Sequence, residues 1–482
     1  MSQLFLFSMK RRQFIKNSAA VAASSFILPR FSIGQSVPAH KPLRLAVMGV
    51  GNITHAHALS WAGTASRRHI ATLLCDVDQR RLDPINPMIH RPDISFAKCF
   101  PDAIRTTDYR TAFEQYGDEF DAVLCGSADH HHFGIAKLAL EHGKPIYCEK
   151  PICWSPHEGF LLRLAAAEAK VATQMGNQGN SMNTWRIADA YYQHGHLGDI
   201  TEVHGWIYSD GARDAAVKKF AEVGTAIPSE LDWSKWCGAA GEHAYQNGIH
   251  PGQWRWWIPF GGGYIGDWGC HVFGGLFKTL GDFGYPSKVE IVKATEFNGD
   301  QFPKGMTVKW TFPARAGKPQ MDMYFHTAHF DDPAFQPPRP DDLEADKSWP
   351  VSKHGCYWKG TKGTFLFNEG HNGSGLIIPD QKRRDIGRIE QLHPVIKGNS
   401  FLNHGDDWVA AIHGEKEWDD TVSSFEHGAY LSAVAQMGNS ALRAGHAIDV
   451  DPQTGFPVKS EDVQHFTRQH PSEDWYGMMS HL

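Results

Sequence analysis

The sequence lacks several features that would place it in a specialised class of protein. It has no C-x-x-C pair, no internal repeat, no low-complexity segment and, after residue 36, no apolar run long enough to cross a membrane. Its eight cysteines lie mostly in apolar, strand-like segments, which is typical of buried free thiols and argues against a zinc site. A formal charge of −6 disfavours nucleic acid or an anionic membrane as the main partner.

What remains is the composition of a globular protein with more than one domain. Apolar residues make up 41% of the chain and charged residues 21%, which is ordinary for a folded protein. A length of 482 residues exceeds what one hydrophobic core supports, since domains average roughly 150 residues. We therefore expect two domains with long insertions.

Residues 1–36 are predicted to be an export signal and not part of the fold. Paired arginines at Arg11 and Arg12, followed by Phe14 and Lys16, precede a modestly apolar stretch over residues 18–28. This order is typical of a twin-arginine signal, and the stretch is too short to span about 30 Å of hydrocarbon. We expect a periplasmic or otherwise exported protein that passes the twin-arginine machinery folded and loaded with cofactor. A basic N-terminal tail is the alternative.

Strands alternate with helices over the next 130 residues of the chain. The pattern predicts strands over 43–48, 70–76, 122–126, 145–148 and 171–175, helices starting at His55 and Gln79, and a helix over 156–169. Such alternation is typical of βαβ units around a parallel sheet. It predicts an amino-terminal Rossmann dinucleotide-binding domain over residues 42–178.

The pattern changes after residue 179. A helix over 184–194 precedes alternating segments at 201–208, 288–291, 307–312, 320–325, 356–359 and 364–367, and a last helix covers 426–443. Alternating polar and apolar residues are typical of an open, mostly antiparallel sheet. We predict an α/β protein overall, with an α+β substrate-binding domain over 179–450, a surface loop over 326–350 and an irregular tail over 451–482.

A glycine-rich turn directly follows the first predicted strand. Gly49 permits a tight turn, Gly51 permits close approach of a pyrophosphate, and Thr54 stands where a third glycine or alanine is usual. Asp76 ends the second strand, where a carboxylate holds ribose hydroxyls and disfavours a 2′-phosphate, so NAD is favoured over NADP. The predicted cofactor contacts of this region are Gly49, Gly51, Asn52, Ile53 and Asp76.

Two further segments carry groups suited to chemistry on a hydroxyl. Lys150 follows a predicted parallel strand, whose carboxyl end faces the cofactor crevice, and can place a positive charge beside a reacting oxygen. Asp267 and His271 are four residues apart and share a face on a helix, where they can form an acid–base pair. The alternatives are a solvated lysine at position 150 and, for Asp267 and His271, either a capping aspartate with a core histidine or a metal-binding pair.

Three consecutive histidines, residues 130–132, follow Ser127 at another strand end. Adjacent residues do not share a helix face and no acidic cluster completes a ligand set, so we predict no metal. Contact of this segment with the cofactor and the substrate pocket is the preferred interpretation.

Taken together, these motifs resemble the Gfo/Idh/MocA family of glucose–fructose oxidoreductases and inositol dehydrogenases. The resemblance runs from residue 43 to about 450 and takes in the glycine turn, Asp76, residues 127–132, Glu149-Lys150-Pro151 and Asp267-x-x-x-His271. Other stretches, such as residues 175–179 and 254–257, resemble a subgroup rich in exported members.

The resemblance implies a role for each matching residue. Lys150 would orient and polarise the reacting oxygen, Asp267 would orient substrate or His271, and His271 would take the hydroxyl proton. The cofactor would be lined by Ser127, His132, Glu149, Lys150 and Gln178 as well. The family usually has an aspartate three residues after the histidine, where this chain has Gly274, which puts the usual sugar specificity in doubt. Candidate substrate contacts are Trp154, Arg186, Tyr245, Arg255 and His130.

Three functions fit these residues. The preferred one is an NAD-dependent oxidoreductase that oxidises a hydroxyl of a sugar, sugar derivative or polyol, with NAD held tightly because no soluble pool exists outside the cytoplasm. A redox-neutral NAD-dependent glycosidase or lyase uses the same residues, through transient oxidation of a ring hydroxyl. The third is a non-catalytic sugar-binding protein. A homodimer or tetramer is expected, since the family's open sheet often pairs across subunits.

Overall fold

The computed structural model describes residues 42–61, 69–88, 95–209, 220, 226–315, 317–329, 332–349, 352–367, 375–389 and 400–468. The predicted export signal over residues 1–36 lies outside the described residues. No helix in the described ranges is long and apolar enough to cross a membrane.

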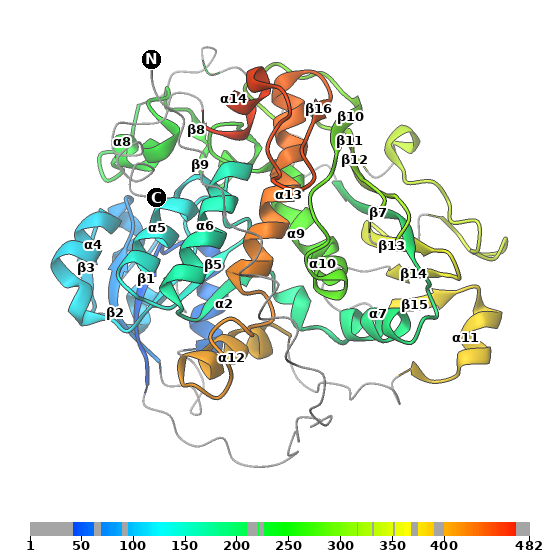
Figure 1. Ribbon diagram of the computed structural model, residues 1–482. Helices are drawn as coiled ribbons and strands as arrows, with labels where there is room; N and C mark the ends of the chain where they lie inside the picture. The colour runs from blue at the N-terminus through cyan, green and yellow to red at the C-terminus, as the bar shows by residue number, and fades with distance from the viewer. Residues whose placement is uncertain are drawn as a thin grey trace, which may run out of the picture. The chain divides into compact units, whose positions relative to one another are not determined.

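The amino-terminal half is built on a six-stranded parallel sheet (Figure 1). Its strands are β1 (Arg44–Met48), β2 (Ile70–Cys75), β3 (Ile104–Thr106), β4 (Ala122–Cys125), β5 (Ile146–Glu149) and β6 (Thr173–Gly176). They lie in the order β3-β2-β1-β4-β5-β6, and every pairing is parallel. The strand order reverses between β1 and β4, which is the switch point where such sheets bind ligands. The predicted Rossmann sheet is confirmed.

Helices pack on both faces of this sheet. One face carries α4 (Tyr109–Tyr116), α5 (Asp129–Glu141) and α6 (Pro156–Ala169), whose apolar residues share a core with β1, β2, β4 and β5. The other face carries α3 (Phe96–Cys99) and α12 (Ser400–Ile412). Trp408 of α12 is fully buried there and donates its indole N–H to the Ala172 carbonyl at 3.0 Å. A late segment of the chain therefore completes the first domain.

The second half is built on an eight-stranded sheet. Its strands are β7 (Ile200–Ser209), β10 (Lys288–Ala294), β11 (Met306–Phe312), β12 (Met321–His329), β13 (His354–Gly360), β14 (Thr364–Phe367), β15 (Gly375–Ile378) and β16 (Ile448–Asp449). The order is β15-β14-β13-β7-β12-β11-β10-β16, and only β7 and β12 pair in parallel. This confirms the expected mostly antiparallel second sheet.

One face of the second sheet packs on a long central helix, α13 (Phe425–Ala444), which also lies along α6 (Figure 1). Trp310 of β11 donates its indole N–H to the Val434 carbonyl of that helix at 2.8 Å. The other short elements are α2 (Asn52–Trp61), α7 (Asn183–Gln193), α8 (Trp233–Cys237), β8 (Asn247–Gly248), β9 (His250–Pro251), α9 (Cys270–Val272), α10 (Gly274–Leu280), α11 (Asp380–Ile386) and α14 (Val463–Phe466).

Three local expectations need correction. The helix expected from Gln79 is a single 3-10 turn over Gln79–Arg81, because Pro84 and Pro87 follow within one to two turns. The expected loop over 326–350 begins inside β12, and its Phe335 is buried against the outer face of the second sheet.

The tail after residue 451 is also more ordered than expected. It includes α14, and its Arg468 is buried against Glu158 of α6, with the guanidinium Nε donating to the carboxylate at 2.6 Å. A second N–H of Arg468 donates to the His130 carbonyl at 3.0 Å. The tail therefore contacts both α5 and α6 of the first domain.

Candidate active site

A cavity of about 450 Å³ opens at the carboxyl ends of the parallel strands. It is lined by the residues that follow β1, β2, β4 and β5, including Gly49, Asp76, Ser127 and Lys150. This is where doubly wound sheets bind nucleotides. The sequence motifs that follow four different strands therefore meet in one place.

The glycine turn fits a dinucleotide. Gly49 has a φ of +84°, and a Cβ there would lie 2.5 Å from the Ser127 nitrogen, so only glycine is accommodated. Helix α2 begins at Asn52, which lines the cavity with Ile53, and its amino terminus offers backbone N–H groups to a phosphate. Thr54, in the third motif position, binds the Gly51 carbonyl through its hydroxyl at 2.6 Å and stabilises the turn.

Asp76 lies between the glycine turn and the cavity. One carboxylate oxygen accepts the Val50 N–H at 2.8 Å and the other the Asp78 N–H at 3.0 Å. Each oxygen keeps a lone pair that can accept a ribose hydroxyl. Burial raises the pKa of Asp76, and the nearby Arg81 guanidinium opposes that rise. Arg81 lines the cavity too, but no sequence signal had marked it.

Ser127, His132 and Glu149 line the cavity as expected of cofactor contacts, whereas Gln178 lies behind them. The Gln178 amide donates to Glu149 at 2.9 Å, and the His57 ring contacts the same carboxylate oxygen at 2.8 Å. Burial alone would raise the pKa of Glu149, but the His57 hydrogen bond and the Lys150 charge outweigh burial and lower it. Gln178, which follows β6, therefore positions Glu149 at the end of the neighbouring strand β5.

Lys150 contacts Asp267 directly, and this ion pair joins the two halves of the chain. The second oxygen of Asp267 lies 3.5 Å from Nε of Arg255, and Arg255 donates to Asp129 at 3.1 Å. Asp267 therefore lies between two cations, Lys150 and Arg255, both of which line the cavity. Such a carboxylate fixes the position of the Lys150 ammonium group.

His271 lies one turn beyond Asp267 on the same helical segment. The expected α-helical spacing is altered, because Ile265–Gly269 is a π-helical turn and His271 belongs to α9. Such turns often occur at functional sites. The His271 ring meets Trp268 with centroids 5.6 Å apart, and its Nδ1 would lie 3.8 Å from a Cβ placed on Gly179.

Gly274 is explained by packing. A Cβ on Gly274 would lie 2.1 Å from Oδ1 of Asn180, which is 6% exposed. Asn180 follows β6 and donates its amide N–H to the Ser423 hydroxyl at 2.8 Å. Asn180 thus occupies the space that an aspartate at position 274 would need.

The candidate substrate residues do not all meet at the cavity. Arg255 lines it and stacks on Trp254, with the guanidinium carbon 4.4 Å from the ring centroid. The rings of Trp154 and His130 are buried and bonded to backbone carbonyls, Trp154 to Ile258 at 2.8 Å and His130 to Trp236 at 2.7 Å. Tyr245 packs in an aromatic cluster, and Arg186 lies in α7.

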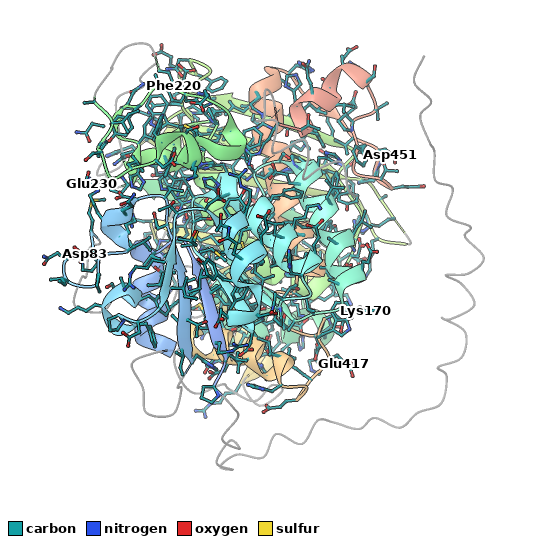
Figure 2. The ribbon with its side chains drawn as sticks, turned by 90° about the vertical axis from the view of Figure 1, so that its left-hand side faces the viewer. Asp83, Lys170, Phe220, Glu230, Glu417 and Asp451 are labelled. Carbon is teal, nitrogen blue, oxygen red and sulfur yellow. The ribbon has the colours of Figure 1, made fainter. Side chains whose placement is uncertain are left out.

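Residues 228–256, here called the strap, form part of the cavity wall. The strap contributes Trp236, His250, Gln253, Trp254 and Trp256 to the lining. Its Glu230 carbonyl accepts the Gln79 N–H at 3.0 Å, and Figure 2 shows Glu230 and Asp83 on the same side of the molecule. His250 contacts the buried Asp78 at 2.8 Å. No periodic pattern in the sequence predicts these contacts.

Comparison with known proteins identifies the first domain. Residues 43–177 match the GFO_IDH_MocA family model, described as oxidoreductase family, NAD-binding Rossmann fold. The first domain is thus similar to the NAD-binding Rossmann domain that this family model describes, and the glycine turn and Asp76 fit NAD.

Two curated relatives and one solved structure are similar to the chain. It is 27% identical over 195 residues to the uncharacterized oxidoreductase YfiI of Bacillus subtilis (strain 168), covering 37% of this chain and 47% of the relative. It is 30% identical over 148 residues to a glycosyl hydrolase family 109 protein of Stenotrophomonas maltophilia (strain K279a), covering 30% of each. The chain therefore spans less than half the length of these relatives.

The solved structure covers far more of the chain. Levoglucosan dehydrogenase, in complex with NADH and L-sorbose, superposes with a TM-score of 0.55 at 16% identity, covering 86% of this chain and 100% of that one. This likeness shows that the two proteins share the two-domain fold.

Proposed function

We propose that this protein is an NAD-dependent oxidoreductase that oxidises a hydroxyl group of a carbohydrate or polyol. The observation that carries the proposal is the contact of Lys150 with Asp267 at the edge of the cavity formed by the glycine turn and Asp76. A positive charge held beside a dinucleotide site is what oxidation of an alcohol requires, because negative charge develops on the oxygen as its proton leaves. Bound NAD supplies the hydride acceptor.

The lysine is the group that meets the reacting oxygen. Its ammonium group donates hydrogen bonds and stabilises developing negative charge on the substrate oxygen. Asp267 holds Lys150 in place, and Arg255, which also donates to Asp129, holds Asp267 in turn. His271 is proposed to take the hydroxyl proton, since it follows Asp267 by one turn and an imidazole accepts protons near neutral pH.

A sugar or polyol substrate is supported by the cavity lining and by the similar structure. Trp254 and Trp256 offer aromatic faces next to Arg255 and Lys150, so apolar ring faces and hydrogen-bonding groups lie together. The levoglucosan dehydrogenase of similar fold was solved with NADH and L-sorbose.

A redox-neutral glycosidase is the second candidate, favoured by the relative named as a glycosyl hydrolase. In that reaction a ring hydroxyl is oxidised transiently, and the same electrons return after the glycosidic bond has broken. Such a cycle needs a cofactor that stays bound, and the strap that forms part of the cavity wall suits retention.

The test replaces Lys150 with methionine, which keeps the length of the side chain and removes its charge. Turnover should fall by about 10²–10⁴-fold while NAD, released by denaturation and identified by mass spectrometry, stays stoichiometric. Lys144→Met is the matched control, because Lys144 lies at the other end of β5 and donates to the Phe120 carbonyl at 2.9 Å. Turnover retained by Lys150→Met, or lost equally in Lys144→Met, contradicts the proposal.

Substrate screening separates the two candidates. Free sugars and polyols that change the absorbance of reduced nicotinamide support the oxidoreductase. Cleavage of aryl glycosides with no net change in that absorbance supports the glycosidase.

Export through the twin-arginine pathway and assembly into a homodimer or tetramer are part of the proposal. Arg11 and Arg12 support export. Fractionation of cells expressing Arg11→Lys/Arg12→Lys tests it, since the variant should stay in the cytoplasm. Sedimentation of the purified protein gives the oligomeric state.

A further inference from the structure

Two cysteines and a histidine meet beneath the floor of the cavity. Cys125 ends β4 and Cys148 lies in β5, and the two residues are paired in the register of these neighbouring strands. Both side chains are fully buried. His132 of α5 completes the group, and the two sulfur atoms and a ring nitrogen lie within 4.8 Å of one another. The proposed oxidation chemistry uses neither thiol.

Both ring nitrogens of His132 lie close to backbone carbonyl oxygens. Nδ1 lies 2.6 Å from the Pro151 carbonyl oxygen and Nε2 lies 3.0 Å from the Ser127 carbonyl oxygen. Carbonyl oxygens only accept hydrogen bonds, so both ring nitrogens donate when the ring is protonated. Both nitrogens of this ring are thus engaged by backbone carbonyl oxygens, and the ring lies beside the two sulfur atoms.

The two thiols are inequivalent. Burial alone would raise the pKa of Cys125, but hydrogen bonds from Cys148 and Ser127 and the charge of His132 outweigh burial and bring it to about 6. The Ser127 hydroxyl lies 3.4 Å from the Cys125 sulfur. Burial raises the pKa of Cys148 well above its usual range, and the negative charges of Glu149 and Asp129 add to the rise. Cys125 is therefore the nucleophile and Cys148 the thiol beside it.

We propose that Cys125 and Cys148 form a peroxide-sensitive modification site under the cofactor cavity. The Cys125 thiolate attacks hydrogen peroxide, the O–O bond breaks, and the products are a sulfenic acid on Cys125 and, after protonation, water. The Cys148 sulfur then displaces the sulfenic hydroxyl, which leaves as a second water with the Cys148 proton. Two thiols lose two electrons and two protons, and one peroxide is reduced to two waters.

The sheet geometry permits the disulfide. Neighbouring strands lie about 4.8 Å apart, within the Cα separations of roughly 4.4–6.8 Å that disulfides span. Peroxide is small enough to enter the cavity, and two residues that line it lie near the thiols: the Ser127 hydroxyl is 3.4 Å from the Cys125 sulfur, and a His132 nitrogen is within 4.8 Å of both sulfur atoms. The bond would join the strand ends that carry Ser127 and Lys150, so bound NAD should slow oxidation.

The experiment is peptide mapping of the full chain after treatment with hydrogen peroxide. We expect a peptide pair linked through Cys125 and Cys148, two hydrogens lighter than the thiols and restored by dithiothreitol, with several-fold slower formation in excess NAD. Cys75 is the matched control, because it also lines the cavity but burial raises the pKa of its thiol well above the usual range. It should stay a thiol under the same conditions.

The rate of alkylation, which depends on the ionised fraction of each thiol, is a second measurement that does not require a disulfide to form. At pH 7 a thiol with a pKa of about 6 is roughly 30 times more ionised than one with a pKa of about 8.5. Iodoacetamide should therefore label Cys125 before Cys75 in NAD-free protein, and His132→Asn should remove the preference. The proposal would be overturned if Cys125 and Cys148 stayed unmodified under conditions that oxidise the exposed Cys99. Stoichiometric Zn²⁺ retained by the wild type and lost in Cys125→Ser would also overturn it.

Discussion

Replacing His250 with alanine should speed the release of NAD by about tenfold. The strap forms part of the cavity wall, and one of its ties to the first domain is the contact of His250 with Asp78 at 2.8 Å. Asp78 is fully buried, and the hydrogen bonds from His250 and Arg80 outweigh burial and hold its pKa well below the usual range. The substitution removes a charge-assisted hydrogen bond without disturbing the glycine turn.

The expected size of the effect follows from the hydrogen bonds that Asp78 keeps in the variant. Hydrogen bonds to charged groups contribute about 1.5–3 kcal/mol, and a group left without a partner costs more. Arg80 still donates to Asp78 at 2.7 and 2.8 Å, so the carboxylate keeps a partner and the loss should lie near 1.5 kcal/mol. A change of about 1.4 kcal/mol is tenfold in a rate or an equilibrium.

The assay follows the loss of bound NADH fluorescence after dilution into excess NAD. His446→Ala is the control, because His446 makes a contact of the same kind and length, 2.8 Å, with the buried Asp462 and does not line the cavity. An unchanged dissociation rate in a folded His250→Ala protein would refute the reasoning that the strap retains the cofactor. An equal increase in His446→Ala would show that the effect is a general loss of stability.

Two further predictions concern stability. Arg468→Ala should lower the free energy of unfolding, measured by urea titration, by about 3–5 kcal/mol, because it leaves the buried Glu158 carboxylate without its cation. A decrease below about 1 kcal/mol would mean that the tail is not needed for folding. His404→Gln should reduce the fall of melting temperature between pH 6.5 and pH 4, because burial lowers the pKa of His404 to about 4. In the native protein His404 is neutral, donates to the Met175 carbonyl and accepts from Ser181. The unfolded chain therefore takes up a proton at this histidine at a higher pH than the native protein does, and stability decreases as the pH falls from 6.5 to 4. An unchanged pH dependence of the melting temperature in His404→Gln would exclude His404 as the cause of this decrease.

The parallel sheet was predictable because its signal is local. Buried strands such as β1 and β4 are continuous apolar runs, and each is followed at once by glycine. Lys150 and Asp76 could be placed at the cavity for the same reason, since the end of a parallel strand fixes where the next residue lies. A three-residue strand such as β3 carries too few positions to show a period.

The contacts that cross the chain could not be predicted. Arg468 reaches Glu158 over 310 positions of sequence, and His250 reaches Asp78 over 172. No periodicity in the sequence links the two members of such a pair. From sequence alone, an arginine in the tail is expected to be exposed to solvent, because its buried partner cannot be identified. The failed expectation for Gln79 has a different origin, because proline residues beyond the predicted start limited the helix to one turn.

The glycine at position 274 shows how a departure from a family motif can be read in three dimensions. In the sequence it is only a missing carboxylate beside the proposed catalytic histidine. In the structure the space is taken by Asn180, whose Oδ1 would lie 2.1 Å from a Cβ on Gly274, and Asn180 is held by Ser423. A neutral amide from the loop after β6 thus lies where an acid would otherwise stand. The difference therefore involves two positions together, and Gly274→Asp alone cannot restore the usual arrangement, because Asn180 would have to move first.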